Sequence, residues 1–472
     1  MIENVTRKNK MRLLIILGLG LFAIKILYMK SVELMLPNMW LQWSMNKNVS
    51  WDSFYIEVIT FVIVFLVYAV SQAKDSTISF FSTVLFIIYF IPNNSVLVLS
   101  GYELDYYLLV NLFCFLLFGV VAVISSKEKR QYTLSKQSGR VESIVKIWDN
   151  KALISTIRVM TIVFCLFVLI QAYYYNGLNF NIILDSMYDV RSDYAANVAE
   201  IEGSIMSYVL MVITKTYSWM LLVCLYCSIM AKKPLDVILC LVSFFAIFTI
   251  EMQKSTLFVL LIVFFIAWCE KSNKIQKLSQ IAIGAILVFF LVVFAEYFIW
   301  KKSELFYLIV RRMFYMPSFL TNVYYEFFNV NSKIWLTQDV LLIKNILQKM
   351  VGSNYSNGMV TIIAQNVFNG EVASPNTGLF AEAFSQMGIL GVFIFPAIYG
   401  VYIKLMKDAS IRYGTGVSMV IMAKLVLSFL NVPMTQSGNM VGVIMFALIS
   451  YFIIKPHTKR ANVTLIKESE TN

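Results

Sequence analysis

A single carboxylate, Glu382, lies in the stretch SPNTGLFAEAFSQMGILGVF, residues 374–393, where a polar segment becomes apolar. In GLFAEAFSQMGILG the apolar residues recur at spacings of three and four, which predicts a helix with one apolar face. Glu382 would lie near the edge of that face, where partial loss of water raises the proton affinity of a carboxylate. Such a group suits a general base, so we take Glu382 as a candidate catalytic residue. The alternative is an ordinary surface acid at the mouth of a helix.

Four cations lie in unusual surroundings and are candidates for binding an anion. Arg191 lies among acids in DSMYDVRSDY, and Lys254 opens an apolar segment in EMQKSTLFVLL. Arg311 and Arg312 are adjacent and flanked by aromatic residues. Arginine offers phosphate a bidentate hydrogen bond and lysine offers a point charge, so a shared external site would suit phosphate or pyrophosphate. Alternatively, Lys254 pairs with Glu251, and the two arginines contact solvent or lipid headgroups.

Other kinds of site find little support in the sequence. All six cysteines fall within or at the ends of apolar segments, and no histidine or acid lies beside the C-x-x-C of Cys224 and Cys227. We therefore expect these cysteines to serve packing. The one histidine, His457, follows the last apolar segment and is given no role. The short basic loops contain no Walker pattern or glycine-rich phosphate loop, so we expect no metal, no cofactor and no nucleotide ligand.

The elements that must position these residues are membrane helices. Hydrophobic residues make up 59% of the 472-residue chain and charged residues 14%, which lies outside the range of soluble domains. The first apolar segment has a basic start but no small-residue cleavage site, so we expect it to be retained. The sequence predicts an all-α, polytopic membrane protein with a single domain, residues 1–472. About twelve spans are expected, roughly at 12–29, 54–70, 78–92, 106–124, 154–174, 205–230, 235–250, 254–269, 279–299, 386–405, 413–431 and 438–454.

The charge distribution predicts how the spans are oriented. The N-terminus, every second connection and the C-terminal tail are rich in Lys and Arg, whereas the connections 93–105 and 175–204 are mainly acidic. By the positive-inside rule both termini lie in the cytoplasm. The net charge of +12 reflects this asymmetry, so we expect no nucleic acid as a partner. The longest connection, 300–385, would be a partly helical external loop in which Pro317 breaks a helix.

Four features of the sequence occur in the order that a known family shows. They are many spans with one large late external loop, the segment NGLNFNIILDSMYDVRSDY with its Arg191, the polar break QKS at 253–255, and NTGLFAEAFSQMGILG before the tenth span. In these features, which cover residues 170–405, the chain resembles the Wzy-type polymerases of bacterial O-antigen and capsular polysaccharide repeat units. The first four spans resemble that family only in general character.

The resemblance implies a glycosyltransferase at the outer face of the bacterial cytoplasmic (inner) membrane. Such an enzyme transfers the growing glycan from undecaprenyl pyrophosphate to the next lipid-linked oligosaccharide, and it needs a base for the acceptor and cations for the departing pyrophosphate. It is expected to work with a flippase and a chain-length-regulating co-polymerase. The implied catalytic residues are Glu382, Arg191, Arg311 and Arg312; the implied substrate-binding residues are Lys254, Asn376 and Asp193, the last also a reserve base.

Two other interpretations stay open. A lipid-linked oligosaccharide flippase or polysaccharide exporter would also have about twelve spans, although such transporters usually have two similar halves and short loops. O-antigen ligases have a similar architecture, but their external loop carries a histidine near the motif that here reads SPNTGLF, and 300–385 contains none. The family more often has Arg at the position of Lys254, and Lys cannot reproduce a bidentate contact.

Overall fold

The computed structural model describes residues 2–36, 49–72, 76–137, 151–176, 209–210, 212–251, 254–336, 355, 358–369, 378–435 and 437–453. Within these ranges the regular structure is entirely helical, as the sequence predicts. Seven of these helices are long and apolar enough to cross a membrane: Met11–Met35, Trp51–Ser71, Ser76–Ser100, Leu104–Ser126, Val212–Met230, Ile275–Trp300 and Ile389–Tyr413. The chain is therefore a polytopic membrane protein.

The remaining predicted spans also coincide with helices. These are α7 (Lys151–Asn176), α9 (Pro234–Glu251), α10 (Lys254–Lys271), α17 (Thr415–Asn431) and α18 (Ser437–Ile453). None of the five combines the length and hydropathy of the seven candidate spans over its described residues. A total of twelve spans, and the side of the membrane on which each connection lies, stay predictions.

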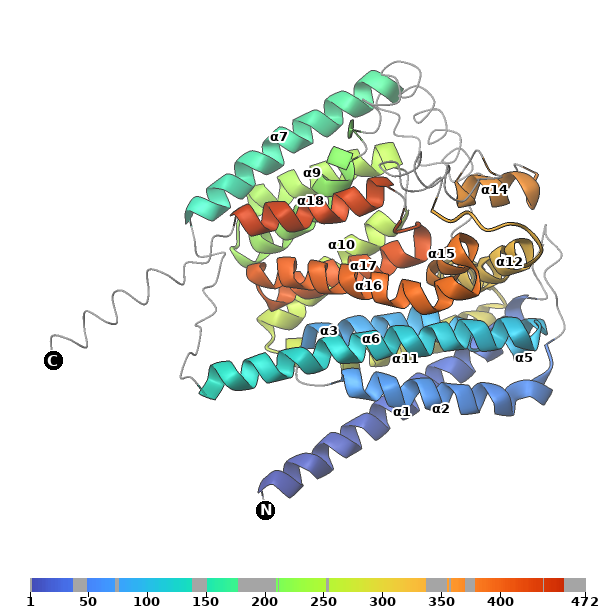
Figure 1. Ribbon diagram of the computed structural model, residues 1–472. Coiled ribbons are helices and arrows are strands. Elements are labelled where there is room, and N and C mark those ends of the chain that lie inside the picture. The colour runs from blue at the N-terminus through green and yellow to red at the C-terminus, as the bar shows by residue number, and fades with distance from the viewer. Residues whose placement is uncertain are drawn as a thin grey trace.

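The first helical group surrounds a central, buried helix (Figure 1). This helix consists of α3 (Ser76–Leu85), the π-helical η3 (Phe86–Phe90), α4 (Ile91–Asn93) and α5 (Val96–Ser100). In its most apolar stretch 94% of the residues are buried inside the protein. Its Ser, Thr and Asn side chains therefore face other helices and can form hydrogen bonds with them. The helices around it are α1 (Ile2–Met35), α2 (Phe54–Ser71) after the short η2 (Trp51–Ser53), α6 (Leu104–Gln137), and α11 (Leu278–Trp300) after η5 (Ile275–Lys277).

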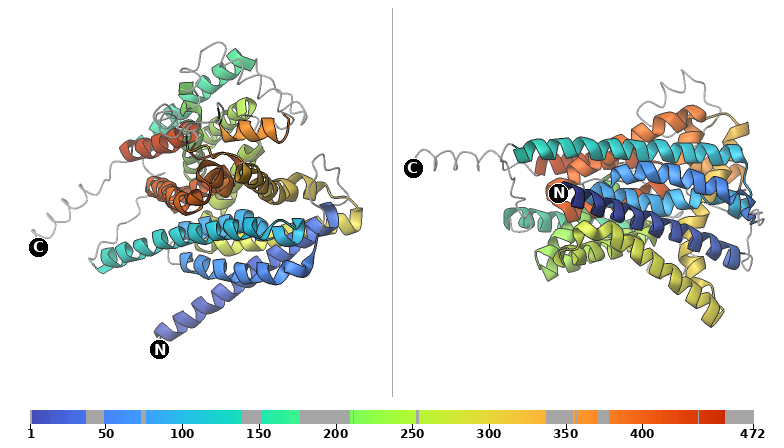
Figure 2. Two further views of the ribbon diagram at one scale, coloured as in Figure 1. Left: turned by 45° about the vertical axis from the view of Figure 1, so that its right-hand side comes forward. Right: turned by 90° about the horizontal axis from the view of Figure 1, so that it is seen from below.

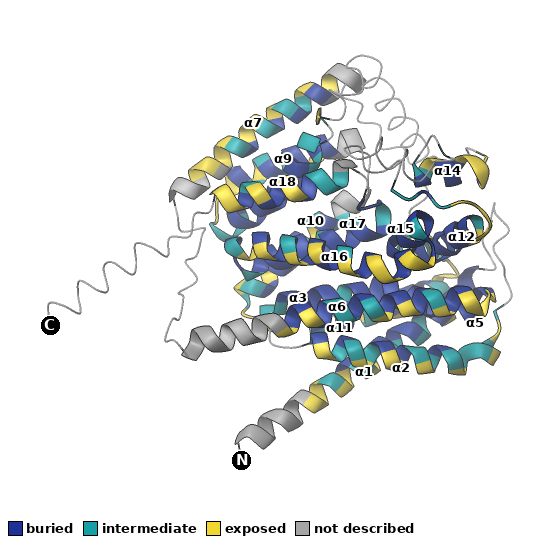
Figure 3. Cartoon of the chain, in the orientation of Figure 1, coloured by how far each residue is buried: buried dark blue, intermediate teal, exposed yellow. Residues whose placement is uncertain are grey.

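Two helices connect this group to a second one, which contains α7, α9, α10, α18 and the helix Val212–Met230 (Figure 1). α16 (Ile389–Ser410), followed by η7 (Ile411–Tyr413), packs on α6 and on α18. α17 packs on α3 and on α10. α17 is therefore buried along most of its length, whereas α1, α2 and α11 expose apolar side chains such as Leu19, Ile59 and Leu291 on the outer surface (Figure 3).

α1 begins and α18 ends at the same end of the bundle (Figures 1 and 2). The opposite end carries α5, the π-helical η6 (Phe306–Tyr315) and α12 (Met316–Val330), with α14 (Met359–Asn366) nearby. α15 (Gly378–Met387) packs between α12 and α16. The expected partly helical character of 300–385 is thus present in its described residues.

Pro317 does not break the helix, contrary to the sequence-based expectation. η6 and α12 are continuous, and Pro317 lies in the first turn of α12. In the π-helical segment the hydrogen bonds span five residues, and the N–H of Met316 donates to the carbonyl of Arg311. An α-helical interior accommodates proline poorly, because proline has no N–H to donate and its ring collides with the preceding turn. The wider π-helical turn leaves room for the ring.

Candidate functional site

α15 and α16 form a tight hinge whose geometry requires glycine. Gly388, between the two helices, has φ +58°, a conformation that side chains rarely adopt. Gly391, in the first turn of α16, lies against the backbone of α15, and a Cβ atom there would be 1.9 Å from the carbonyl oxygen of Ala383. The end of α15 is also fixed by the segment that follows α12, because the N–H groups of Ile334 and Trp335 donate to the carbonyls of Ser385 and Gln386.

We expect Gly391→Ala to force the two helices apart and lower the free energy of unfolding by about 1–3 kcal/mol, the usual cost of overpacking. The measurement is the melting temperature of the purified protein in detergent. Gly284→Ala in α11 is the matched control, because nothing lies within 4 Å of its Cβ position. An unchanged melting temperature for Gly391→Ala would show that α15 and α16 do not pack as closely at Gly391 as the structure has them.

Glu382 lies in the middle of α15, and its carboxylate holds the connection between α17 and α18. Its Oε1 accepts from the backbone N–H and the hydroxyl of Thr435, both at 2.6 Å. Its Oε2 accepts from the Tyr399 hydroxyl at 2.7 Å and from the N–H of Met434 at 3.0 Å. The carboxylate therefore links α15 and α16 to residues 432–435, which join α17 to α18.

The structure places Glu382 deeper than the helical periodicity suggests. The residue is only 1% exposed, because Tyr399 of α16 and residues 434–435 contact its carboxylate and its neighbours on α15 are buried as well. Burial raises the pKa of Glu382 above its ordinary value, and the hydrogen bonds from Thr435, Tyr399 and Met434 oppose that rise. Four donors surround the carboxylate, and no Lys or Arg of the described chain forms an ion pair with it.

Arg311 and Arg312 lie in η6, at the end of the bundle away from the first residues of α1. The guanidinium of Arg311 lies 4.9 Å from the ring centre of Tyr307, and its buried Nε has no hydrogen-bond partner. Neither arginine forms an ion pair with a described acid. Of the two, Arg311 is therefore the cation with unused hydrogen-bonding capacity.

Arg311 borders a buried group of phenol side chains. Burial raises the pKa of Tyr315, and the charge of Arg311 opposes that rise. The hydroxyl of Tyr315 lies near Ser100 and that of Tyr28 near Ser318, although neither hydroxyl forms a hydrogen bond of ordinary geometry. No hydrogen bond or ion pair joins Arg311 or Arg312 to Glu382, so the described contacts do not bring these predicted residues into one site.

The other predicted site residues are placed only in part. Lys254 is the first residue of α10. Arg191, Asp193 and Asn376 lie outside the described residues. Their predicted roles therefore stay predictions. Among the described residues, no group of three or more His, Cys, Asp or Glu side chains could hold a metal ion.

No family model, curated protein or solved structure matches this chain. Its likeness to the polysaccharide polymerases therefore depends on the four sequence features given above. What the chain can do chemically has to be argued from its own residues.

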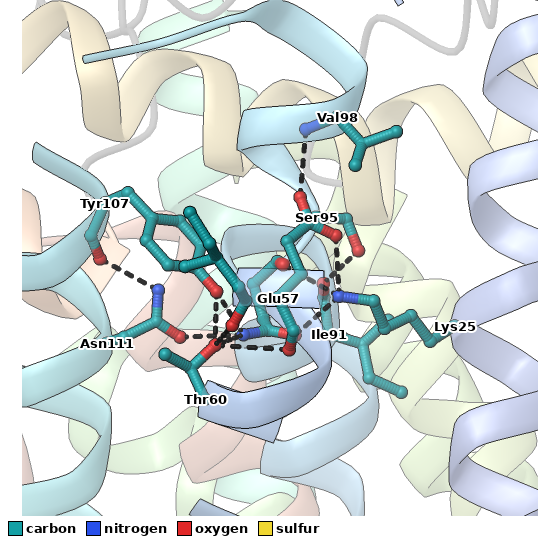
Figure 4. Close-up of polar contacts among 10 residues, drawn as sticks. Lys25, Glu57, Thr60, Ile91, Ser95, Val98, Tyr107 and Asn111 are labelled. Carbon is teal, nitrogen blue, oxygen red and sulfur yellow. Dashed lines mark hydrogen bonds and ion pairs between the residues drawn. The ribbon is translucent and has the colours of Figure 1, made fainter. Parts of the chain in front are cut away.

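A buried charged network escaped the sequence-based prediction (Figure 4). Lys25 of α1 donates to Glu57 Oε2 of α2 at 2.8 Å, to the carbonyl of Asn94 at 2.8 Å and to Asn94 Oδ1 at 2.6 Å. Glu57 Oε1 accepts from the N–H of Val98 at 2.9 Å, and both charged side chains are fully buried. Asn94 also donates to Asn111 of α6 at 3.0 Å. Because all three ammonium hydrogens have acceptors, this network serves structure.

A second pair of cations also escaped prediction. Lys215 of the helix Val212–Met230 and Lys424 of α17 line a cavity of about 80 Å³. Lys424 lies in the predicted span 413–431 and Lys215 in 205–230. The available signal was that an ionisable side chain within a span usually faces a partner or a cavity.

Proposed function

We propose that this protein is a polymerase of lipid-linked oligosaccharide repeat units in the bacterial cytoplasmic membrane, with both termini in the cytoplasm. It transfers the growing glycan from undecaprenyl pyrophosphate to the terminal sugar of the next lipid-linked unit. One observation carries the proposal: GLFAEAFSQMGILG, part of one of the four features of the resemblance, forms α15 and the turn into α16 and buries a carboxylate surrounded by donors. A surface acid would have no such surroundings.

The proposed chemistry uses Glu382 as the base. Four donors occupy the carboxylate, so in this proposal a sugar hydroxyl takes the place of the Thr435 hydroxyl, which donates to Oε1 at 2.6 Å, a distance that also suits proton transfer. In the reaction the acceptor proton passes to Glu382 and the acceptor oxygen bonds to the anomeric carbon of the growing glycan. The bond from that carbon to the pyrophosphate oxygen breaks, and its electron pair stays on the pyrophosphate.

The departing pyrophosphate needs positive charge, which the proposal assigns to Arg311 with Arg312, Arg191 and Lys254. Arg311 supports this role through its buried Nε without a partner. Asn376 and Asp193 are assigned to the sugars. A flippase supplies the lipid-linked units from the cytoplasmic face, and a co-polymerase sets the chain length.

Deleting the gene in its host and analysing the lipid-linked glycans tests the proposal. We expect single repeat units on the lipid carrier at the outer face of the membrane, with polymer restored by the wild-type gene. Units trapped at the cytoplasmic face would instead indicate a flippase. Long polymer that stays on its lipid carrier would indicate a ligase, and either result would overturn the proposal.

Arg311→Lys is expected to shorten the polymer or abolish it while the protein level in the membrane stays normal. Lysine keeps the charge but loses the planar, bidentate donor group, and it stacks less well on Tyr307. Polymer length on a gel, normalised to protein level, is the measurement. Arg312→Lys should have the smaller effect, and Lys302→Gln, an exposed cation at 64% side-chain exposure, is the control. Full-length polymer from both arginine variants would make them ordinary interfacial charges.

A further inference from the structure

The cavity between the helix Val212–Met230, α17 and α18 contains a combination of side chains that the proposed function does not use. We name it the two-lysine cavity after Lys215 and Lys424, which come from different helices. Its other polar lining residues carry hydroxyl or amide groups, and none of the described lining residues is Asp or Glu. They are Ser218, Ser428, Asn431 and Asn439.

Lys424 reaches from α17 to the neighbouring helix. Its Nζ donates to Ser218 Oγ at 2.7 Å and lies 4.5 Å from the ring centre of Trp219. Ser218 in turn donates its own hydroxyl hydrogen to the carbonyl of Lys215 at 2.8 Å. The ammonium group is therefore held in place by a hydroxyl and an aromatic ring, at the wall of the cavity.

Lys215 is held on the opposite side by α18. At Gly442 a Cβ atom would lie 3.1 Å from the Cβ of Lys215, so the glycine allows α18 to pack closely on the lysine stem. This packing limits the directions that the long side chain can take. Both lysines thus contact neighbouring helices, and both line one cavity.

The cavity has a size and a charge that suit a phosphate group. At about 80 Å³ it exceeds the roughly 10–15 Å³ that one water requires, so it can hold several waters or a small anion. The ammonium groups of the two lysines can donate charge-assisted hydrogen bonds to the oxygens of such an anion, and opposite charges attract more strongly at low dielectric. Hydroxyl and amide groups can satisfy further oxygens of such an anion.

Glu382 also shapes this cavity from outside it. Met434 lines the cavity, and its N–H is the group that donates to Glu382 Oε2 at 3.0 Å. The same carboxylate holds Thr435, the next residue. One wall of the two-lysine cavity is therefore positioned by α15.

We infer that the two-lysine cavity binds a phosphate-bearing anion, either free or as the headgroup of a lipid. The inference depends on the cavity and its two cations and is independent of the proposed function. A chain with another activity would still have this site.

Binding to the purified, delipidated full-length protein tests the inference with two probes. Inorganic pyrophosphate, followed by isothermal titration, represents a free anion. Phosphatidylglycerol, compared with phosphatidylcholine by native mass spectrometry, represents an anionic headgroup. We expect at least one probe to bind and Lys215→Gln or Lys424→Gln to weaken it by about tenfold or more, because each removes a charged hydrogen-bond donor. Binding of the lipid alone would identify a headgroup, and binding of pyrophosphate as well would identify an open phosphate site.

Three comparisons keep the test decisive. Lys424→Arg keeps the charge and should retain binding within about threefold, since both side chains are cationic at neutral pH. Lys404→Gln, an exposed lysine of α16 that pairs with Asp408, should leave binding unchanged. The inference is overturned if neither probe binds the wild-type protein, if the two Gln variants bind like wild type, or if Lys424→Arg loses as much affinity as Lys424→Gln.

Discussion

Replacing Lys25 by Met while Glu57 is kept should lower the free energy of unfolding by about 3–5 kcal/mol, the usual cost of leaving one charge of a buried pair uncompensated. Of the described hydrogen bonds to its carboxylate, Glu57 would retain the one from the N–H of Val98 and lose the one from Lys25. The loss should be large because Lys25 also holds both the carbonyl and the side chain of Asn94. Three segments, α1, α2 and the connection between α4 and α5, would lose their common link.

The melting temperature and the yield of monodisperse protein in detergent measure this effect. The double variant Lys25→Met with Glu57→Gln should recover part of the stability, because no buried charge is left alone. Lys30→Met is the matched control on the same helix: its pair with Glu33 is exposed and is expected to contribute no more than about 1 kcal/mol. Equal losses from Lys25→Met and Lys30→Met would mean that the buried network contributes little.

Glu382→Gln should stop polymer formation and also lower the free energy of unfolding by about 1–3 kcal/mol. A glutamine has one carbonyl oxygen where the carboxylate has two acceptors, and its NH₂ group would face donors from Thr435 or from Tyr399 and Met434. The structure predicts a defect in both stability and chemistry, because the same carboxylate fixes residues 432–435.

Separating the two effects of Glu382 needs variants of its partners. Tyr399→Phe removes one of the four donors and should lower stability slightly while polymer is still made. Glu326→Gln, at an exposed position of α12, is the control for loss of a carboxylate elsewhere. Polymer length and melting temperature are read for each variant. If Glu382→Gln still makes long polymer and Asp193→Asn does not, the base belongs to 175–204 and the assignment to Glu382 fails.

The sequence by itself determined the class of protein and the positions of its helices. Hydrophobic runs identify membrane helices without any tertiary information, because a span must be long and apolar whatever lies beside it. The segment around Glu382 was identified in the same local way, since its polar start and helical spacing are visible in a short stretch of sequence. The expected break at Pro317 is wrong, because the π-helical turn of η6 accommodates the proline and continues into α12.

Only the tertiary structure decided which polar side chains meet. Lys25 and Glu57 are 32 residues apart, and Glu382 and Thr435 are 53 apart. Helical period shows which face of a helix is apolar, but it does not show what covers the other face. Tyr399 of α16 and residues 434–435 cover the side of α15 that carries Glu382, and so bury a carboxylate that periodicity places at an edge. Lys215 and Lys424 likewise share a cavity because α18 and α17 pack on the helix between Val212 and Met230, and such packing depends on side-chain shapes contributed by distant parts of the chain.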